Sequence, residues 1–308
     1  MTRRASQLSV QSLEARANPA GNIVAQLSGG DLALFGDSLG NEVRVAQLAT
    51  GAVRATGLNG TTVNGLPAVT FPATPLNKVE ANLEAGNDRL DLNRLTVASD
   101  ILVQAGDGAD RVNLTGDIAG DKIFIAGGTG DDTIRSTDVS VVGDLNVDGE
   151  DGAATVNFTR ASLTGSLAVV TKDANDTVTV LDSTVTGNLR VETGKGDDTA
   201  TVRRTSVGLG MAVITDEGND RVNLSELTVG EDLNLETGKG EDVLTLNGVG
   251  VLKSINLNTD DGNDRVTATA VSAGIDAIFV GGAGIDTFDD NGVTAGVKKE
   301  VKEFEFVI

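Results

Sequence analysis

The sequence predicts an all-β protein folded as a parallel β-helix, a solenoid of stacked coils. An aspartate recurs every 22 residues from Asp88 to Asp286, and Ala154 occupies the one step that lacks it. Apolar residues follow each aspartate at alternate positions, as Leu244 and Leu246 follow Asp242. A fixed period of this length is typical of repeat architectures, and alternation at period two is the signal of a β-strand. The recurring residues are Asp88, Asp110, Asp132, Asp176, Asp198, Asp220, Asp242, Asp264 and Asp286.

Each 22-residue unit is expected to form one coil with about three short strands. In the unit that follows Asp242, the inward positions are Leu244, Leu246, Val251, Ile255 and Leu257, and they recur in the other units. Gly, Asn, Asp and Ser lie between these positions and suit corners. Coils of this kind bury their apolar side chains only when they stack, about 4.8 Å apart, into parallel ladders. About ten such coils, wound in a right-handed sense, are therefore predicted.

The chain divides into four segments on this basis. Residues 1–20 are expected to be a disordered leader of the export type. Residues 21–82 show strand-like alternation out of register and predict degenerate coils that form an N-terminal cap. Residues 83–290 carry the regular repeats. Residues 291–308 predict a C-terminal cap strand, in which Lys298, Lys299 and Lys302 oppose pairing with another sheet edge.

The composition excludes several classes of function. The 308 residues carry a formal net charge of −21, which argues against nucleic acid and anionic membranes as partners. The sequence contains no run of apolar residues long enough to span a membrane. It also lacks His and Cys, the usual residues of general-base and thiol chemistry, so a non-enzymatic protein is expected. A polysaccharide-acting enzyme is the alternative, because such enzymes use parallel β-helices.

The corners carry the most specific motif. Residues 127–135, GGTGDDTIR, and residues 281–289, GGAGIDTFD, match the pattern Gly-Gly-x-Gly-x-Asp-x-apolar-x. This pattern resembles the calcium-binding nonapeptide of the repeats-in-toxin family, in which stacked corners hold calcium between carboxylates and backbone carbonyls. The resemblance implies calcium as cofactor, although that family has about two such corners per coil and this chain has one. The implied metal-site residues are Asp88, Asp110, Asp132, Asp198, Asp220, Asp242, Asp264, Asp286, Gly106, Gly108, Gly128, Gly130, Gly282 and Gly284.

The sequence is also compatible with corners that bind no metal. In this metal-free interpretation, each aspartate accepts backbone N–H bonds within its own corner, and the aspartates form a regular solvated row that water and nearby arginines screen. If calcium does bind, the row of ions should be interrupted near Ala154 and Ala174, which replace an aspartate and a glycine. A run of threonines before the corners, from Thr171 to Thr259, predicts hydrogen-bonded ladders. The alternative explanation is that outward Thr-x-Thr pairs form an ice-binding face, as in β-helical antifreeze proteins.

Two further resemblances concern location and role. Residues 12–20, SLEARANPA, resemble a short segment near the start of many exported planctomycete proteins. The array at 83–290 is similar to the Gly-Asn-Asp-rich repeat proteins of planctomycete surfaces. Together they imply a secreted or cell-surface protein with a structural or adhesive role, calcium as a ligand, and cell-surface or matrix components as partners. A metal-free spacer is the alternative within the same architecture.

Overall fold

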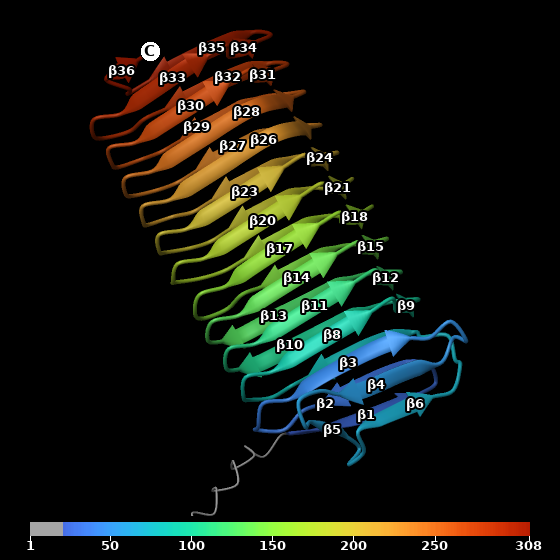
Figure 1. Cartoon of the computed structure of the whole chain (residues 1–308). Helices are drawn as coiled ribbons and strands as arrows, with labels where there is room; N and C mark the ends of the chain where they lie inside the picture. Colours follow the sequence, from blue (N-terminus) through green and yellow to red (C-terminus); the bar gives the residue numbers. More distant parts are fainter. Residues whose placement is uncertain (1–20) are drawn as a thin grey trace, which may run out of the picture.

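The predicted β-solenoid is confirmed. A computed structural model describes residues 21–308, which form stacked coils of β-strands along a rod (Figure 1). No α-helix occurs in residues 21–308, so this part of the chain has no helix that could cross a membrane.

Each coil contributes up to three strands to the stack (Figure 1). The first face consists of β8 (Arg89–Asn93), β11 (Arg111–Thr115), β14 (Thr133–Thr137), β17 (Thr155–Thr159), β20 (Thr177–Leu181), β23 (Thr199–Arg203), β26 (Arg221–Val229), β28 (Val243–Val251), β30 (Arg265–Thr269), β33 (Thr287–Asn291) and β36 (Phe306–Val307). The short strands are β9 (Thr96–Val97), β12 (Ile118–Ala119), β15 (Ser140–Val141), β18 (Ser162–Leu163), β21 (Thr184–Val185), β24 (Ser206–Val207), β31 (Ser272–Ala273) and β34 (Thr294–Ala295); β26 and β28 run through this region without a break. The remaining face consists of β7 (Lys78–Asn82), β10 (Ile101–Asp107), β13 (Ile123–Thr129), β16 (Leu145–Asp148), β19 (Leu167–Val170), β22 (Leu189–Glu192), β25 (Met211–Ile214), β27 (Leu233–Glu236), β29 (Ile255–Asn258), β32 (Asp276–Val280) and β35 (Lys298–Lys302).

Neighbouring coils pair in parallel with a constant offset of 22 residues. In β26 and β28, for example, Val222 lies opposite Leu244 and Val229 opposite Val251. The predicted inward columns are buried along the whole array, and Leu233 is 0% exposed. Stacking like residues on like residues therefore gives one continuous aliphatic core.

The coils approach one another closely at a column of glycines two residues before the aspartates. We call these residues the Gly column: Gly86, Gly108, Gly130, Gly152, Gly196, Gly218, Gly240, Gly262 and Gly284, with Ala174 at the remaining step. The carbonyl oxygen of Gly218 faces the Cα of Gly240 so closely that a Cβ at Gly240 would overlap it. Gly240 also has φ of +146°, a conformation that L-residues rarely adopt.

The substitution Gly240→Ala is therefore expected to destabilise the protein by about 3 kcal/mol or more, since the added methyl must push two coils apart. A matched control is Gly29→Ala, because Gly29 also has positive φ (+61°) but nothing lies within 4 Å of its ideal Cβ. That control should lose only about 1 kcal/mol, the cost of the left-handed backbone alone. Urea unfolding followed by circular dichroism measures both. Equal losses would show that close packing of the coils does not constrain this column.

The N-terminal segment caps the array differently from the expectation. Its strands are β1 (Asn22–Ser28), β2 (Asp31–Phe35), β3 (Glu42–Gln47), β4 (Val53–Gly57), β5 (Thr62–Val63) and β6 (Ala68–Phe71). β2 and β3 stack in parallel on β7 and β8, as a degenerate coil would. However, β1 pairs antiparallel with β2, and β4 pairs antiparallel with β3 and β6. The expectation of degenerate coils alone was thus incomplete, because hairpins fold back over the end of the core and cover it (Figure 1).

At the other end, the regular register continues beyond residue 290, where the sequence suggested that it stops. β35 pairs with β32 at the same 22-residue offset, with Val280 opposite Lys302. Phe304 then packs against the core, and its ring centroid lies 5.4 Å from that of Phe288. The three lysines that were expected to oppose edge pairing do lie on the last strand of this sheet, β35.

Candidate functional site

The recurring aspartates, which we call the Asp column, point into the solenoid. All nine are 0 to 3% exposed. The expectation of a solvated row was therefore wrong. Asp88 immediately precedes β8 and faces inward as Leu90 and Leu92 do, because positions separated by two residues in extended backbone share a face.

One carboxylate oxygen of each aspartate in the Asp column ties two coils together. The backbone N–H of Asp198 donates to Oδ1 of Asp220 at 2.8 Å, and the N–H of Asp220 donates to Oδ1 of Asp242 at 2.8 Å. The metal-free interpretation placed these bonds within one corner, whereas the structure places them between neighbouring coils. They satisfy N–H groups at a corner where the sheet ladder is interrupted.

At both ends of the Asp column and at the step that lacks an aspartate, a different residue takes part in the hydrogen bond between coils. The N–H of Asn41 in the cap donates to Asp88 Oδ1 at 2.6 Å, and the N–H of Asp286 donates to Glu305 Oε2 at 2.7 Å. At the missed step, the N–H of Asp132 donates instead to the carbonyl of Ala153 at 3.0 Å. Residue 154 still takes part, since its own N–H donates to Asp176 Oδ1.

The second carboxylate oxygen, Oδ2, is buried in every member of the Asp column and has no hydrogen-bond partner within residues 21–308. Five coils place a buried threonine near this oxygen: Thr171, Thr193, Thr215, Thr237 and Thr259. Some of these hydroxyls also donate to the next coil, as Thr259 does to the carbonyl of Gly281 at 2.7 Å. The predicted threonine ladder thus runs to backbone carbonyls. The threonines of the outward Thr-x-Thr pairs are different from these five residues and lie on the first face.

The two corners that match the nonapeptide completely have glycine in place of this threonine. A Cβ on Gly127 would lie directly against Asp132 Oδ2, and a Cβ on Gly281 would lie 2.9 Å from Asp286 Oδ2. At these two corners the residue beside the carboxylate is glycine, which has no side chain. The sequence motif therefore marks the corners at which the residue beside Oδ2 has no side chain.

Burial raises the pKa of the Asp column well above its ordinary value. Loss of solvation raises the pKa of Asp132, Asp198 and Asp264 to about 7, against the opposing effect of the backbone N–H that each carboxylate accepts. The same cause raises the pKa of Asp220 and Asp242 to about 6. Neighbouring carboxylates of the column add to the effect. Near neutral pH these groups are therefore close to the midpoint of protonation.

The predicted glycine ligands lie at the same corners but serve packing. A Cβ on any of the six would overlap a carbonyl oxygen of the preceding coil: Gly106, Gly108, Gly128, Gly130, Gly282 and Gly284. Calcium prefers hard oxygen ligands, and the corner supplies Oδ2 and backbone carbonyls of this type. Within the described chain, no three Asp or Glu side chains gather in a group that could hold a metal ion. A calcium ion here would have to use one carboxylate per coil together with carbonyl oxygens.

A second row of side chains fixes the outside of the same corner. Asn175 Oδ1 accepts the N–H of Asp197 at 2.9 Å, and Asp197 Oδ1 accepts the N–H of Asn219 at 2.9 Å. Here each side chain accepts from the following coil, whereas the Asp column accepts from the preceding one. Adjacent residues of the corner thus bind the coils above and below.

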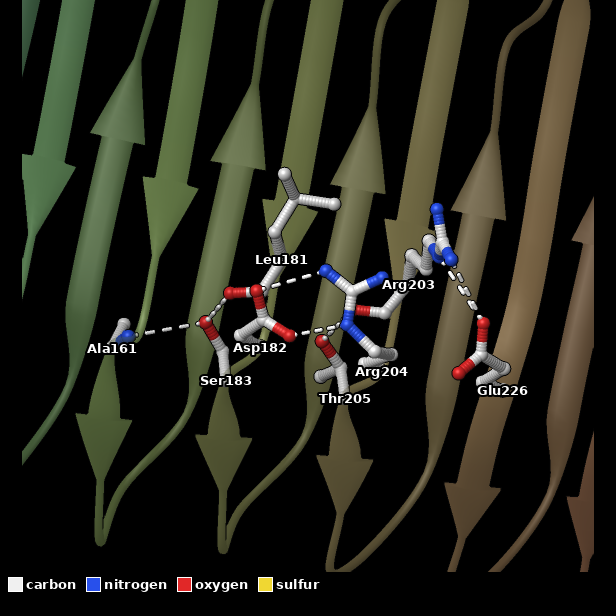
Figure 2. Close-up of polar contacts among 8 residues, drawn as sticks. All are labelled: Ala161, Leu181, Asp182, Ser183, Arg203, Arg204, Thr205 and Glu226. Atoms are coloured by element: carbon white, nitrogen blue, oxygen red, sulfur yellow. Dashed lines mark hydrogen bonds and ion pairs between the residues drawn. The ribbon is translucent and has the colours of Figure 1, made fainter.

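A third row, an exposed ladder of alternating charge, lies after the first strand of each coil. It consists of Asp138, Arg160, Asp182, Arg204 and Glu226, all with left-handed backbone. Figure 2 shows Arg204 directed at the Asp182 carboxylate, with Arg204 Nη2 donating to Oδ2 at 2.9 Å. The neighbouring Ser183 accepts the N–H of Ala161 (Figure 2). Exposed pairs of this kind contribute little individually to the free energy of unfolding.

Sequence reasoning missed two further acidic residues that accept backbone N–H groups of a neighbouring coil. Asp117 is 0% exposed and accepts the N–H groups of Leu95 and Thr115 at 2.7 and 2.9 Å. Glu305 closes the last coil, as described above. The sequence signal for Asp117 was its place in a column that is apolar in neighbouring coils, such as Leu95 and Val139.

No family model matches this chain, and no curated protein or solved structure matches it either.

Proposed function

We propose that this protein is a non-enzymatic β-solenoid with a structural or adhesive role, located at a cell surface or outside the cell. The observation that carries the proposal is the uniformity of the stack. From Asp88 to Asp286 each coil has 22 residues, and the polar rows tie every coil to the next. About ten coils at about 4.8 Å each give a rod of roughly 50 Å, which suits a spacer.

The same uniformity favours a spacer over a polysaccharide-acting enzyme. An enzyme of that type needs insertions that form a cleft around its substrate, and the regular array offers none between Asp88 and Asp286. The location outside the cell depends on the export-type segment at residues 12–20, which lies outside the described residues. It therefore remains part of the proposal.

We further propose that calcium binds at the two corners with the complete motif. The supporting observation is that Asp132 Oδ2 and Asp286 Oδ2 are unpartnered and lie beside Gly127 and Gly281, which place no side chain against them. These carboxylates, with carbonyl oxygens of adjacent coils, would supply the hard ligands that calcium requires. In the threonine-containing coils, by contrast, a hydroxyl lies beside the carboxyl and provides a polar neighbour that needs no metal.

Calcium in the millimolar range is expected to raise the melting temperature near pH 8, and a chelator should reverse the shift. The physical reason is that a ligand bound only by the folded state adds RT ln(1 + [Ca]/Kd) of stability per site. The substitution Asp132→Asn should reduce the shift, since a neutral amide oxygen is a weaker calcium ligand than a carboxylate. Differential scanning calorimetry measures each case.

The control for this experiment is Asp242→Asn, which makes the same change in a coil where Thr237 faces the carboxyl. This variant should retain the full calcium shift. If calcium leaves the melting temperature of the unmodified protein unchanged, the corners bind no calcium and the protein is a metal-free spacer.

A further inference from the structure

A groove on the first face of the rod carries an excess of positive charge, although the chain as a whole is strongly acidic. Its volume is about 430 Å³. Four arginines and a single acidic residue line it: Arg44, Arg89, Arg111, Arg135 and Asp91. We call this feature the arginine groove. It is formed by β3 of the cap together with β8, β11 and β14 of the first coils.

Two of the four arginines neutralise Asp91. Arg89 binds this carboxylate through Nε and Nη2 at 3.0 and 2.9 Å, and Arg44 Nη2 lies 3.3 Å from it. Asn113 Nδ2 donates to the same carboxylate at 2.8 Å. With Asp91 only 5% exposed and held by three side chains, its capacity to accept further donors is used. Asp91 therefore fixes the positions of Arg44 and Arg89.

The other two arginines, Arg111 and Arg135, have no ion pair within residues 21–308, and both are exposed. Arg111 lies directly opposite Arg89 in the ladder, an arrangement that is unfavourable for like charges. Glu42 lies opposite Arg89 on the other side, in β3, and adds one further negative charge beside it. Counting Asp91 and Glu42 against the four arginines leaves a local charge of +2 from the residues named here. The fold thus presents two guanidinium groups without partners.

Guanidinium groups bind carboxylates through two parallel hydrogen bonds, so the free arginines favour a ligand with carboxylate groups. The rest of the arginine groove is lined by neutral amides and hydroxyls, those of Asn93, Thr115 and Thr137 among them. Such groups exchange hydrogen bonds with hydroxyls of a ligand. Four stacked strands span about 14 Å, which is longer than an inorganic oxyanion and suits a short chain of sugar rings.

The overall charge narrows the class of ligand further. A long polyanion such as a nucleic acid would extend beyond the arginine groove onto surfaces where acidic residues dominate, since the net charge is −21. A short ligand can remain within the positive region. We propose that the arginine groove binds a carboxylated sugar chain of the uronate type, with Arg111 and Arg135 holding its carboxylates and the neutral side chains its hydroxyls.

The test is isothermal titration of the full chain with trigalacturonate, in a buffer that contains a chelator so that calcium plays no part. Binding of trigalacturonate, with no binding of the neutral trisaccharide of galactose, is the expected result. The double substitution R111Q and R135Q should weaken binding by about tenfold or more, because it removes two charge-assisted contacts. The melting temperature of this variant should not fall, because neither arginine has a partner in the fold.

A matched control is Arg221→Gln. Arg221 has the same position in its coil as Arg111 and is also exposed, but it lies outside the arginine groove. This variant should bind trigalacturonate as the unmodified protein does. Three results would each overturn the proposal: no binding of trigalacturonate at millimolar concentration, equal loss in the Arg221 variant, or displacement by inorganic sulfate at equal concentration, which would indicate a simple oxyanion site. Because the chelator is present throughout, these outcomes are independent of whether calcium binds at the corners.

Discussion

Lowering the pH from about 8 to about 5 in calcium-free buffer is expected to raise the melting temperature substantially. Burial raises the pKa of Asp88, Asp132, Asp198 and Asp264 from 3.8 to about 7, so the folded protein binds protons more tightly than the unfolded chain. A group of this kind contributes its full stability below the unfolded pKa, near 4, and loses it as the pH rises through about 7. Since several stacked groups act together, we expect one of the largest effects on this protein.

Thermal unfolding over this pH range, in high salt to screen the exposed charges, measures the effect. The substitution Asp198→Asn should make the pH dependence less steep, because an amide keeps the oxygen that accepts the N–H of Asp176 but does not ionise. Its exposed neighbour Asp197 provides the control, and Asp197→Asn should change the pH dependence less, since Asp197 is not itself buried and acts on the column only through its charge beside Asp220. If the two variants behave alike, the buried column does not control the response to pH.

Leu233→Asp is expected to destabilise the protein by about 4 kcal/mol or more. Leu233 is 0% exposed and lies between Met211 and Ile255 in the adjacent coils, so an aspartate here would bury a charge among apolar side chains. No row of backbone N–H groups faces this position, in contrast to the Asp column. Urea unfolding provides the measurement.

The neighbouring position supplies the control for Leu233→Asp. Asn234 is exposed, and its Oδ1 accepts a hydrogen bond from Asn256 that an aspartate would preserve. Asn234→Asp should therefore change stability by less than about 0.5 kcal/mol. Similar losses at both positions would contradict the inward and outward assignment of the strand.

The regular part of the fold could be predicted from the sequence because each position of the repeat has one environment. Leu233 and Leu235 alternate with polar residues, and their equivalents do so in each neighbouring coil. The same rule of alternation would place Asp88 inside with Leu90, since the two residues are two positions apart and both are buried. The rule does not by itself predict buried aspartates, because an isolated buried carboxylate is unfavourable. The stacked backbone N–H groups that make this burial possible appear only once the coils are assembled.

The hairpins of the cap and the arginine groove could not be predicted, since both depend on contacts outside the 22-residue period. Arg44 reaches Asp91 across 47 residues, a separation that no repeat indicates. The antiparallel pairing of β4 with β3 and β6 depends on turns in an irregular segment. The calcium prediction depends on a motif alone and stays a prediction, while the position of Gly127 beside Asp132 Oδ2 shows where to test it.

The offset of 22 residues in every ladder has a consequence for the evolution of the chain. Asp198 and Asp220 each make the contact that their equivalents make one coil away, so excising any 22 consecutive residues from the array joins coils that are already complementary. Duplicating a unit has the same property, since the cap at one end and Glu305 at the other are unaffected. The length of the rod therefore changes in steps of about 4.8 Å for each unit gained or lost. Natural variants that differ in length should differ by whole 22-residue units.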